Sequence, residues 1–136
     1  MAIDRVLQDR RVLIAHENAS QRVYLGEIIQ AAGAIIAGPI DAYADGISLL
    51  NGELRIHAMV ISQMLPYQDA VALLDAAIDN NVRTVIVYPR QVGVKSPFSD
   101  YKCLEAHIAG FQIVEAIAGM LAITRGCIHH SARMRV

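Results

Sequence analysis

Several side chains that could do chemistry stand immediately after short apolar runs of the sequence. His16 and Glu17 follow the run at 12–15, and Ser62 follows the run at 58–61. A serine with a histidine and a carboxylate is the residue set of a hydrolytic triad, in which the imidazole activates the hydroxyl. The sequence around Ser62 lacks a nucleophile elbow and the glycine pattern of an oxyanion hole. We therefore interpret Ser62 as the cap of the following helix or loop, and we expect the protein not to be an enzyme.

The same residues could instead bind a transition metal, because imidazole and carboxylate groups are suitable ligands. His16, Glu17 and His107 are the candidates, but no two of them form the closely spaced histidine pair that metal sites often use. A polar rim around a crevice is the simpler interpretation. His129 and His130, near the end of the sequence, are interpreted as solvated side chains. We expect no metal and no cofactor.

Arg90 follows a further apolar run, at 84–88, and its guanidinium could hold an anion through several donors at once. An ordinary surface arginine is the alternative interpretation. The loop that starts here, 90–95, contains one glycine, Gly93, and matches neither the dinucleotide-binding nor the P-loop glycine pattern. The motifs therefore do not support nucleotide binding.

Short apolar runs alternate along the chain with longer amphipathic stretches, which is typical of strands and helices arranged around a parallel sheet. Asn18 or Ser20 can cap the first helix and Asp41 the second, while Gly38 and Pro39 are expected to end the second strand. The pattern predicts an α/β fold with a doubly wound, five-stranded parallel sheet. The predicted strands are 12–15, 34–37, 58–61, 84–88 and 102–106, and the predicted helices are about 18–32, 41–50, 68–79 and 111–122.

The working crevice of a doubly wound sheet lies beyond the carboxyl ends of its strands. Residues that directly follow the predicted strands are therefore the candidate site. They are His16, Glu17, Ser62, Pro89, Arg90 and His107.

Two of these strand-end segments resemble response-regulator receiver (CheY-like) domains. Residues 12–18, Val-Leu-Ile-Ala-His-Glu-Asn, resemble the strand that ends in an acidic pair in that family. Residues 58–66, Ala-Met-Val-Ile-Ser-Gln-Met-Leu-Pro, resemble the strand that ends in the phosphate-accepting aspartate, with Pro66 four residues after Ser62. The resemblance covers about 11–121. It implies a flavodoxin-like, three-layer sandwich and a role in two-component signalling or a phosphorelay.

The departures from the family pattern concern its phosphorylation site. The resemblance implies two acids that hold Mg²⁺, but His16 stands at the first of these positions and only Glu17 remains. Ser62 replaces the acceptor aspartate, and Pro89 stands near the position of a serine or threonine. The family lysine corresponds to the region of Ala106 and His107, and neither is a lysine. We therefore expect a degenerate receiver, a pseudo-receiver that does not undergo aspartyl phosphorylation.

Length and composition indicate one globular domain. The chain has 136 residues, of which 54% are hydrophobic and 18% charged, with a formal net charge of −1. A length near 100–150 residues is typical of single domains. The absence of a basic excess argues against nucleic acid as a partner. We divide the chain into an N-terminal extension at 1–10, a receiver-like domain at 11–122 and a C-terminal tail at 123–136.

The sequence favours a cytoplasmic protein. The early acid Asp4, followed soon by the charged residues Asp9, Arg10 and Arg11, is not typical of a signal peptide. The longest apolar stretch, 108–124, contains Gln112 and Glu115 and is shorter than the ~20 apolar residues of a membrane span. The chain contains two cysteines, which are not closely spaced and are interpreted as reduced thiols.

Two features point to protein partners. Segment 90–101 is loop-like where the family has its fourth helix, which suggests a changed partner surface or a variable loop. The last predicted helix is apolar on more than one face, so it could form a homodimer or pack deeply under the tail. We expect a signalling protein that acts by protein–protein interaction. The alternative is a small-ligand sensor that uses the crevice.

Overall fold

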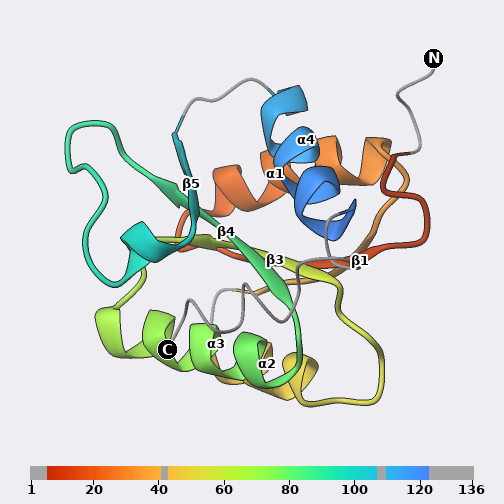
Figure 1. The fold of residues 1–136 in the computed structure, drawn as a ribbon, viewed down its shortest axis with the longest axis horizontal. Helices are drawn as coiled ribbons and strands as arrows, with labels where there is room; N and C mark the ends of the chain where they lie inside the picture. The colour runs from red at the N-terminus through yellow and green to blue at the C-terminus, as the bar shows by residue number, and fades with distance from the viewer. Residues whose placement is uncertain (1–5, 41–42, 107–109, 123–136) are drawn as a thin grey trace.

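The described part of the chain forms a parallel five-stranded sheet with the order β2-β1-β3-β4-β5 (Figure 1). The computed structural model describes residues 6–40, 43–106 and 110–122. All five residues of β3 are buried, which is expected for a central strand covered by helices on both faces. The strands are β1 Arg11–Ala15, β2 Ile35–Ile40, β3 Ala58–Ser62, β4 Arg83–Tyr88 and β5 Lys102–Glu105.

The helices agree with the predicted ones to within one or two residues. Asn18, one of the two predicted caps of the first helix, precedes it, and its side-chain oxygen accepts a hydrogen bond from the Gln21 N–H. Asp41, the predicted cap of the second helix, lies outside the described residues. The helices are α1 Ala19–Ala31, α2 Tyr43–Leu50, α3 Tyr67–Asp79 and α4 Gly110–Ala122, with a 3₁₀ turn, η2, at Phe98–Asp100.

Two hydrophobic cores lie on opposite faces of the sheet. The α2 and α3 residues Leu50 and Leu73 pack on one face, and the α1 and α4 residues Ile29 and Ile117 pack on the other. Figure 1 shows α1 and α4 on one side of the sheet and α2 and α3 on the other. The predicted doubly wound α/β sandwich is therefore confirmed. No helix in the described ranges is both long and apolar enough to cross a bilayer.

The predicted end of the second strand is wrong. β2 continues through Gly38 and Pro39 to Ile40. The register pairs Leu13 with Ala37 but Ala15 with Ile40, so β2 contains one residue more than β1 between these pairs. Gly38 has a φ of +110°, which accommodates this bulge. β2 is an edge strand and has no neighbouring strand on its outer side. A proline, which lacks an N–H, is therefore tolerated in it.

Leu7, in the segment assigned as an N-terminal extension, is fully buried in the core beneath α1 and α4. Its N–H donates to the Ala32 carbonyl at 2.9 Å, and the Asp9 N–H donates to the Gly33 carbonyl at 3.2 Å. Gly33 has a φ of +101°, and a Cβ there would lie 2.9 Å from the Cα of Gln8. A glycine is therefore needed where this segment crosses the end of α1.

Segment 90–101 is predicted to be loop-like, and the structure agrees, because no α-helix lies between β4 and β5. The short 3₁₀ turn η2 takes that place, and its Phe98 is buried against the core on the α2 and α3 face. The connection is therefore a loop fastened at one end by an aromatic side chain.

Candidate functional site

A cavity of about 210 Å³ lies at the carboxyl ends of β1, β3 and β4. It is bordered by four of the predicted site residues, His16, Glu17, Ser62 and Pro89. Parallel strands bring their carboxyl ends to one edge of the sheet, which is why residues far apart in sequence meet here. Most other lining side chains are apolar or aromatic; they include Tyr24, Leu25, Met64, Val87, Tyr88 and Ala106.

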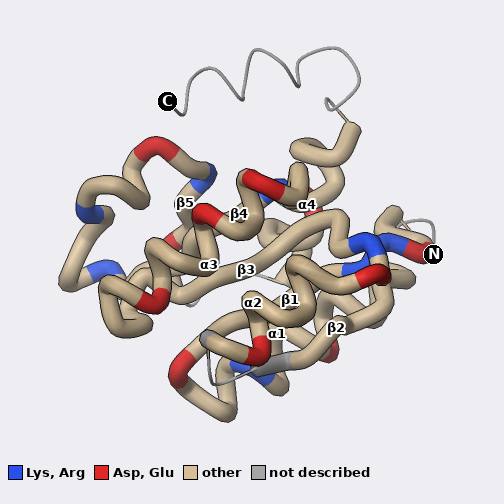
Figure 2. Tube along the Cα trace, turned by 90° about the horizontal axis from the view of Figure 1, so that it is seen from below, with Lys and Arg blue, Asp and Glu red and all other residues tan. Residues whose placement is uncertain are grey.

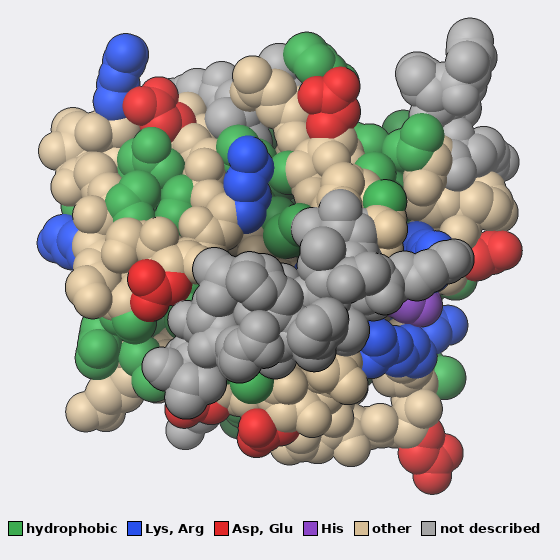
Figure 3. Space-filling model, viewed as in Figure 1, with side chains coloured by type: hydrophobic (Ala, Val, Ile, Leu, Met, Phe, Trp, Pro, Cys, Tyr) green, Lys and Arg blue, Asp and Glu red, His purple; other side chains and the backbone are tan. Residues whose placement is uncertain are grey.

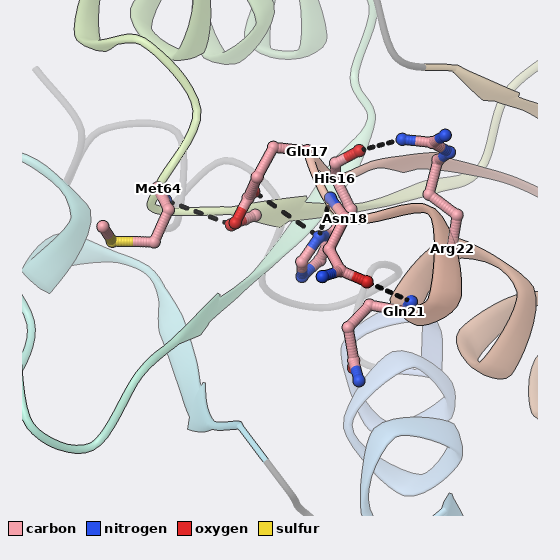
Figure 4. Close-up of polar contacts among 7 residues, drawn as sticks. His16, Glu17, Asn18, Gln21, Arg22 and Met64 are labelled. Atoms are coloured by element: carbon pink, nitrogen blue, oxygen red, sulfur yellow. Dashed lines mark hydrogen bonds and ion pairs between the residues drawn. The ribbon is translucent and has the colours of Figure 1, made fainter.

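His16 directly follows β1 and is only 9% exposed. Its Nδ1 accepts a hydrogen bond from the Asn18 N–H at 3.0 Å, and its carbonyl accepts one from Arg22 Nη1 at 2.7 Å (Figure 4). Burial lowers the pKa of the imidazole; the Glu17 carboxylate raises it and Arg22 lowers it. A neutral ring whose Nδ1 accepts a hydrogen bond carries its proton on Nε2. The net effect lowers the pKa of His16, mainly through burial, and its hydrogen bonds hold the turn into α1.

Glu17 is the sole carboxylate among the described residues that line the cavity. Its Oε1 lies 3.4 Å from His16 Nδ1, and its side chain is 41% exposed. The contact is an ion pair only while the imidazole is protonated. Glu17 therefore places one partly exposed carboxyl group at the cavity.

Ser62 ends β3 and is 2% exposed. Its Oγ accepts a hydrogen bond from the Met64 N–H at 3.0 Å. This is a local turn in which the hydroxyl caps the backbone two residues later. No hydrogen bond joins Ser62 to His16 within the described structure, and His16 Nδ1 already has a different donor. The geometry matches the capping role predicted for Ser62.

Arg90 is not among the residues that line the cavity. Its side chain is 82% exposed, and its Nε lies 3.9 Å from Glu105 Oε2. His107 lies outside the described residues. Ala106, just before it, borders the cavity and donates its N–H to the Tyr88 carbonyl at 2.7 Å.

The residues at the crevice do not fit the Mg²⁺ site that the receiver resemblance implies. Mg²⁺ requires hard oxygen ligands in octahedral geometry, usually including carboxylates. Glu17 supplies one carboxylate. His16 Nδ1 and Ser62 Oγ already accept hydrogen bonds from the N–H groups of Asn18 and Met64. Across residues 6–40, 43–106 and 110–122, no group of three or more His, Cys, Asp or Glu side chains could hold a metal ion.

Gln63 is a buried polar residue whose role the sequence did not indicate. It is 7% exposed, and its Nε2 donates to the Gly93 carbonyl at 2.8 Å. Its Oε1 accepts from the Lys95 N–H at 2.9 Å, and its own N–H donates to the Val87 carbonyl at 2.9 Å. Both ends of the amide therefore fasten the β4–β5 loop beside the crevice. A polar residue directly after a buried strand was the available signal, but its partners are some thirty residues away.

No family model and no curated protein matches this chain. Solved structures do. A CheY-like response regulator receiver domain protein from Methanospirillum hungatei matches with a TM-score of 0.68 and 17% identity, over 85% of this chain and 96% of that one. A response regulator receiver protein from Sinorhizobium medicae matches with a TM-score of 0.64 and 19% identity, over 85% and 97%.

A further match is the pilus assembly protein CpaE from Caulobacter crescentus, with a TM-score of 0.57 and 9% identity, over 83% of this chain and 94% of that one. Identities this low carry information about architecture and not about chemistry. The strand order, the two helical layers and these matches together identify the fold of this chain as that of CheY-like response-regulator receiver domains.

Proposed function

We propose that this protein is a receiver-fold signalling protein that acts through protein–protein contacts and does not undergo aspartyl phosphorylation. The fold supports a place in two-component signalling. The observation that carries the proposal is Ser62, which ends β3 with its hydroxyl oxygen engaged by the Met64 N–H.

The surroundings of Ser62 support the absence of phosphoryl transfer. A serine hydroxyl is a weak nucleophile at neutral pH unless an adjacent base activates it. The histidine that lines the same cavity, His16, uses Nδ1 to accept the Asn18 N–H. The lining offers the methyl group of Ala106 near the place where the resemblance implies a lysine. We extend the proposal to the absence of any hydrolytic activity based on Ser62 or His16.

The partner surface in this proposal is the face formed by the β4–β5 loop, β5 and α4. The side-chain amide of Gln63 fixes the path of this loop through hydrogen bonds to the Gly93 carbonyl and the Lys95 N–H. Phe111, at the start of α4, is 62% exposed. An exposed phenylalanine on this helix suits a protein partner, and a second copy of this chain is one such partner.

The test is phosphorylation with a small-molecule donor and binding of a phosphoryl mimic. Mass spectrometry after acetyl phosphate treatment with Mg²⁺ should find no phosphoryl adduct on the protein or on Ser62→Asp. Thermal unfolding with Mg²⁺ should not change on addition of beryllofluoride. A ligand at ~100 times its Kd adds about 2.7 kcal/mol, which is several degrees for a domain of this size. Such a shift, or a stable adduct, would overturn the proposal.

A small-ligand sensor is the second candidate, and the apolar lining of the cavity favours it. Tyr24, Leu25, Met64 and Val87 form walls suited to a small apolar or aromatic molecule, with Glu17 at the rim. Thermal unfolding of the isolated protein against a panel of small aromatic acids and amines tests this candidate. A stabilising compound whose effect is lost in Ala106→Phe would support it, and no stabilisation by any of them would leave the protein-interaction proposal preferred.

A further inference from the structure

Three arginines gather at the amino edge of the sheet, opposite the crevice. Arg10 and Arg11 lie at the start of β1, and Arg55 lies shortly before β3. These two strands are neighbours in the sheet. Figure 2 shows blue segments, with red beside them, near the described N-terminal end, and Figure 3 shows blue side chains near a histidine on this side of the molecule. We call Arg10, Arg11 and Arg55 the arginine edge.

Backbone carbonyls hold two of these side chains in place. Arg11 Nη1 donates to the Arg55 carbonyl at 3.1 Å. Arg55 Nη1 and Nη2 donate to the carbonyls of Asn80 and Asn81 at 2.8 and 3.3 Å, where α3 ends. A helix C-terminus carries roughly half a negative charge, so such contacts offset only part of the positive charge. Arg11 and Arg55 are therefore positioned without being neutralised.

No described carboxylate forms an ion pair with the arginine edge. The close contacts between basic and acidic side chains of the described residues are His16–Glu17 and Arg90–Glu105. Their residues follow or end strands at the opposite edge of the sheet. Asp9 is close in sequence, and its Oδ1 accepts a hydrogen bond from the neutral Gln8 amide at 3.2 Å. The arginine edge therefore has no ion-pair partner among the described residues.

His57 lies within this cluster and responds to its charge. Its Nδ1 accepts the Arg11 N–H at 2.9 Å. Burial lowers the pKa of His57 most, and Arg10, Arg55 and Arg11 lower it further. All the charged groups that shift this pKa are positive, so His57 provides a local probe of any anion that binds here.

We propose that the arginine edge is a docking surface for an extended acidic segment of a partner protein. Arg10 and Arg11 are consecutive and Arg55 precedes the neighbouring strand, so this surface offers three separate guanidinium groups. Successive Asp or Glu side chains of an extended segment can each meet a different one of them. Arginine binds carboxylates through paired N–H donors, which gives such contacts directional specificity. The surface is distinct from the crevice and from the α4 face, so this docking does not depend on how either of those is used.

The experiment measures binding of a fluorescein-labelled hexaglutamate peptide to the full chain by fluorescence anisotropy at low salt. Arg10→Glu is the informative variant, because Arg10 is exposed and makes no side-chain hydrogen bond or ion pair in the described structure. Lys95→Glu is the matched control, since this exposed lysine lies in the β4–β5 loop beyond the opposite edge. We expect a roughly fivefold loss of affinity in Arg10→Glu, a smaller loss in Arg10→Gln, and little change in Lys95→Glu. Circular dichroism checks that each variant is folded.

An NMR titration supplies a second measurement at the same surface. Saturation with hexaglutamate should raise the pKa of His57 and shift the resonances of Arg10, Arg11 and Arg55. Equal binding of hexaglutamine, or equal losses in Arg10→Glu and Lys95→Glu, would overturn the proposal. Tighter binding of inorganic phosphate or of a single-stranded DNA oligonucleotide than of hexaglutamate would overturn the assignment to an acidic protein segment.

Discussion

Gln63 is the residue that connects the crevice to the β4–β5 loop. Replacement by leucine removes the bonds to the Gly93 carbonyl and the Lys95 N–H and leaves both backbone groups to find water. We expect Gln63→Leu to lower the free energy of unfolding by about 1–3 kcal/mol, measured by urea denaturation. The Lys95 amide should also exchange with solvent faster than in the unmodified protein.

Gln91→Leu is the control for this prediction, since Gln91 is exposed in the same loop. Its stability and the Lys95 exchange rate should stay close to those of the unmodified protein. An unchanged Lys95 exchange rate in Gln63→Leu would mean that the loop keeps its course without the amide.

His16 predicts a pH dependence of stability. Its pKa is lowered in the folded protein, mainly by burial, from an ordinary value of about 6.5. Below that value the unfolded chain binds a proton that the folded chain does not, so the free energy of unfolding falls as the pH falls. We expect urea denaturation at several values between pH 7.5 and 5 to show this decrease, and His16→Gln to reduce it. A steeper decrease in His16→Gln would contradict the prediction.

The sequence predicts the site at the level of which residues meet, but not what they do. His16, Glu17 and Ser62 can be placed together because parallel strands end at one edge. Arg90 cannot be placed, because the direction of a side chain in a turn depends on the local backbone path. The role of Gln63 is hidden in the sequence because its partners belong to a loop whose course follows from tertiary packing of Phe98.

At the scale of elements, two glycines should respond to alanine in opposite directions. Gly38 has a φ of +110° at the bulge in β2, a conformation that residues with a Cβ rarely adopt. Gly119 lies in α4, and among the described residues no atom beyond its neighbouring stretch of helix comes within 4 Å of the place that an alanine methyl group would take. We expect Gly38→Ala to destabilise the protein by about 1–3 kcal/mol and Gly119→Ala to stabilise it by up to about 1 kcal/mol.

Thermal and urea denaturation of the two variants provide the measurement, and each serves as the control for the other. The same sign of change in both variants would show that the bulge does not impose the conformation described for Gly38.

The elements themselves are predictable because their patterns are simple. Four apolar runs are short and continuous, as buried parallel strands require, and the amphipathic stretches between them are long enough for helices. The predicted β2 is too short because glycine and proline usually end strands, and the sequence does not reveal that this strand lies at an edge. The burial of Leu7 is not predictable because a single apolar residue among polar ones has no periodicity.

At the scale of the molecule, the exposed start of α4 predicts self-association. Phe111 is 62% exposed, and burying one such side chain at an interface contributes about 1.5–3 kcal/mol. We expect sedimentation velocity to detect a dimer at high protein concentration, and Phe111→Ser to raise its dissociation constant at least tenfold. Val23→Ser, which changes a residue that is 58% exposed on α1, is the control. A monomer at every concentration, or equal effects of the two substitutions, would exclude the dimer through α4.

The bulged strand β2 also bears on how this molecule resists aggregation. The outer edge of a sheet offers free N–H and C=O groups to a strand from another molecule. Pro39 has no N–H to offer, and the extra residue at Gly38 breaks the regular spacing that an incoming strand would need. At the other edge, β5 has only four residues and begins with the exposed Lys102. Neither edge is a long, regular template for another chain, so fusion of the sheets of two molecules and amyloid-like stacking are both disfavoured.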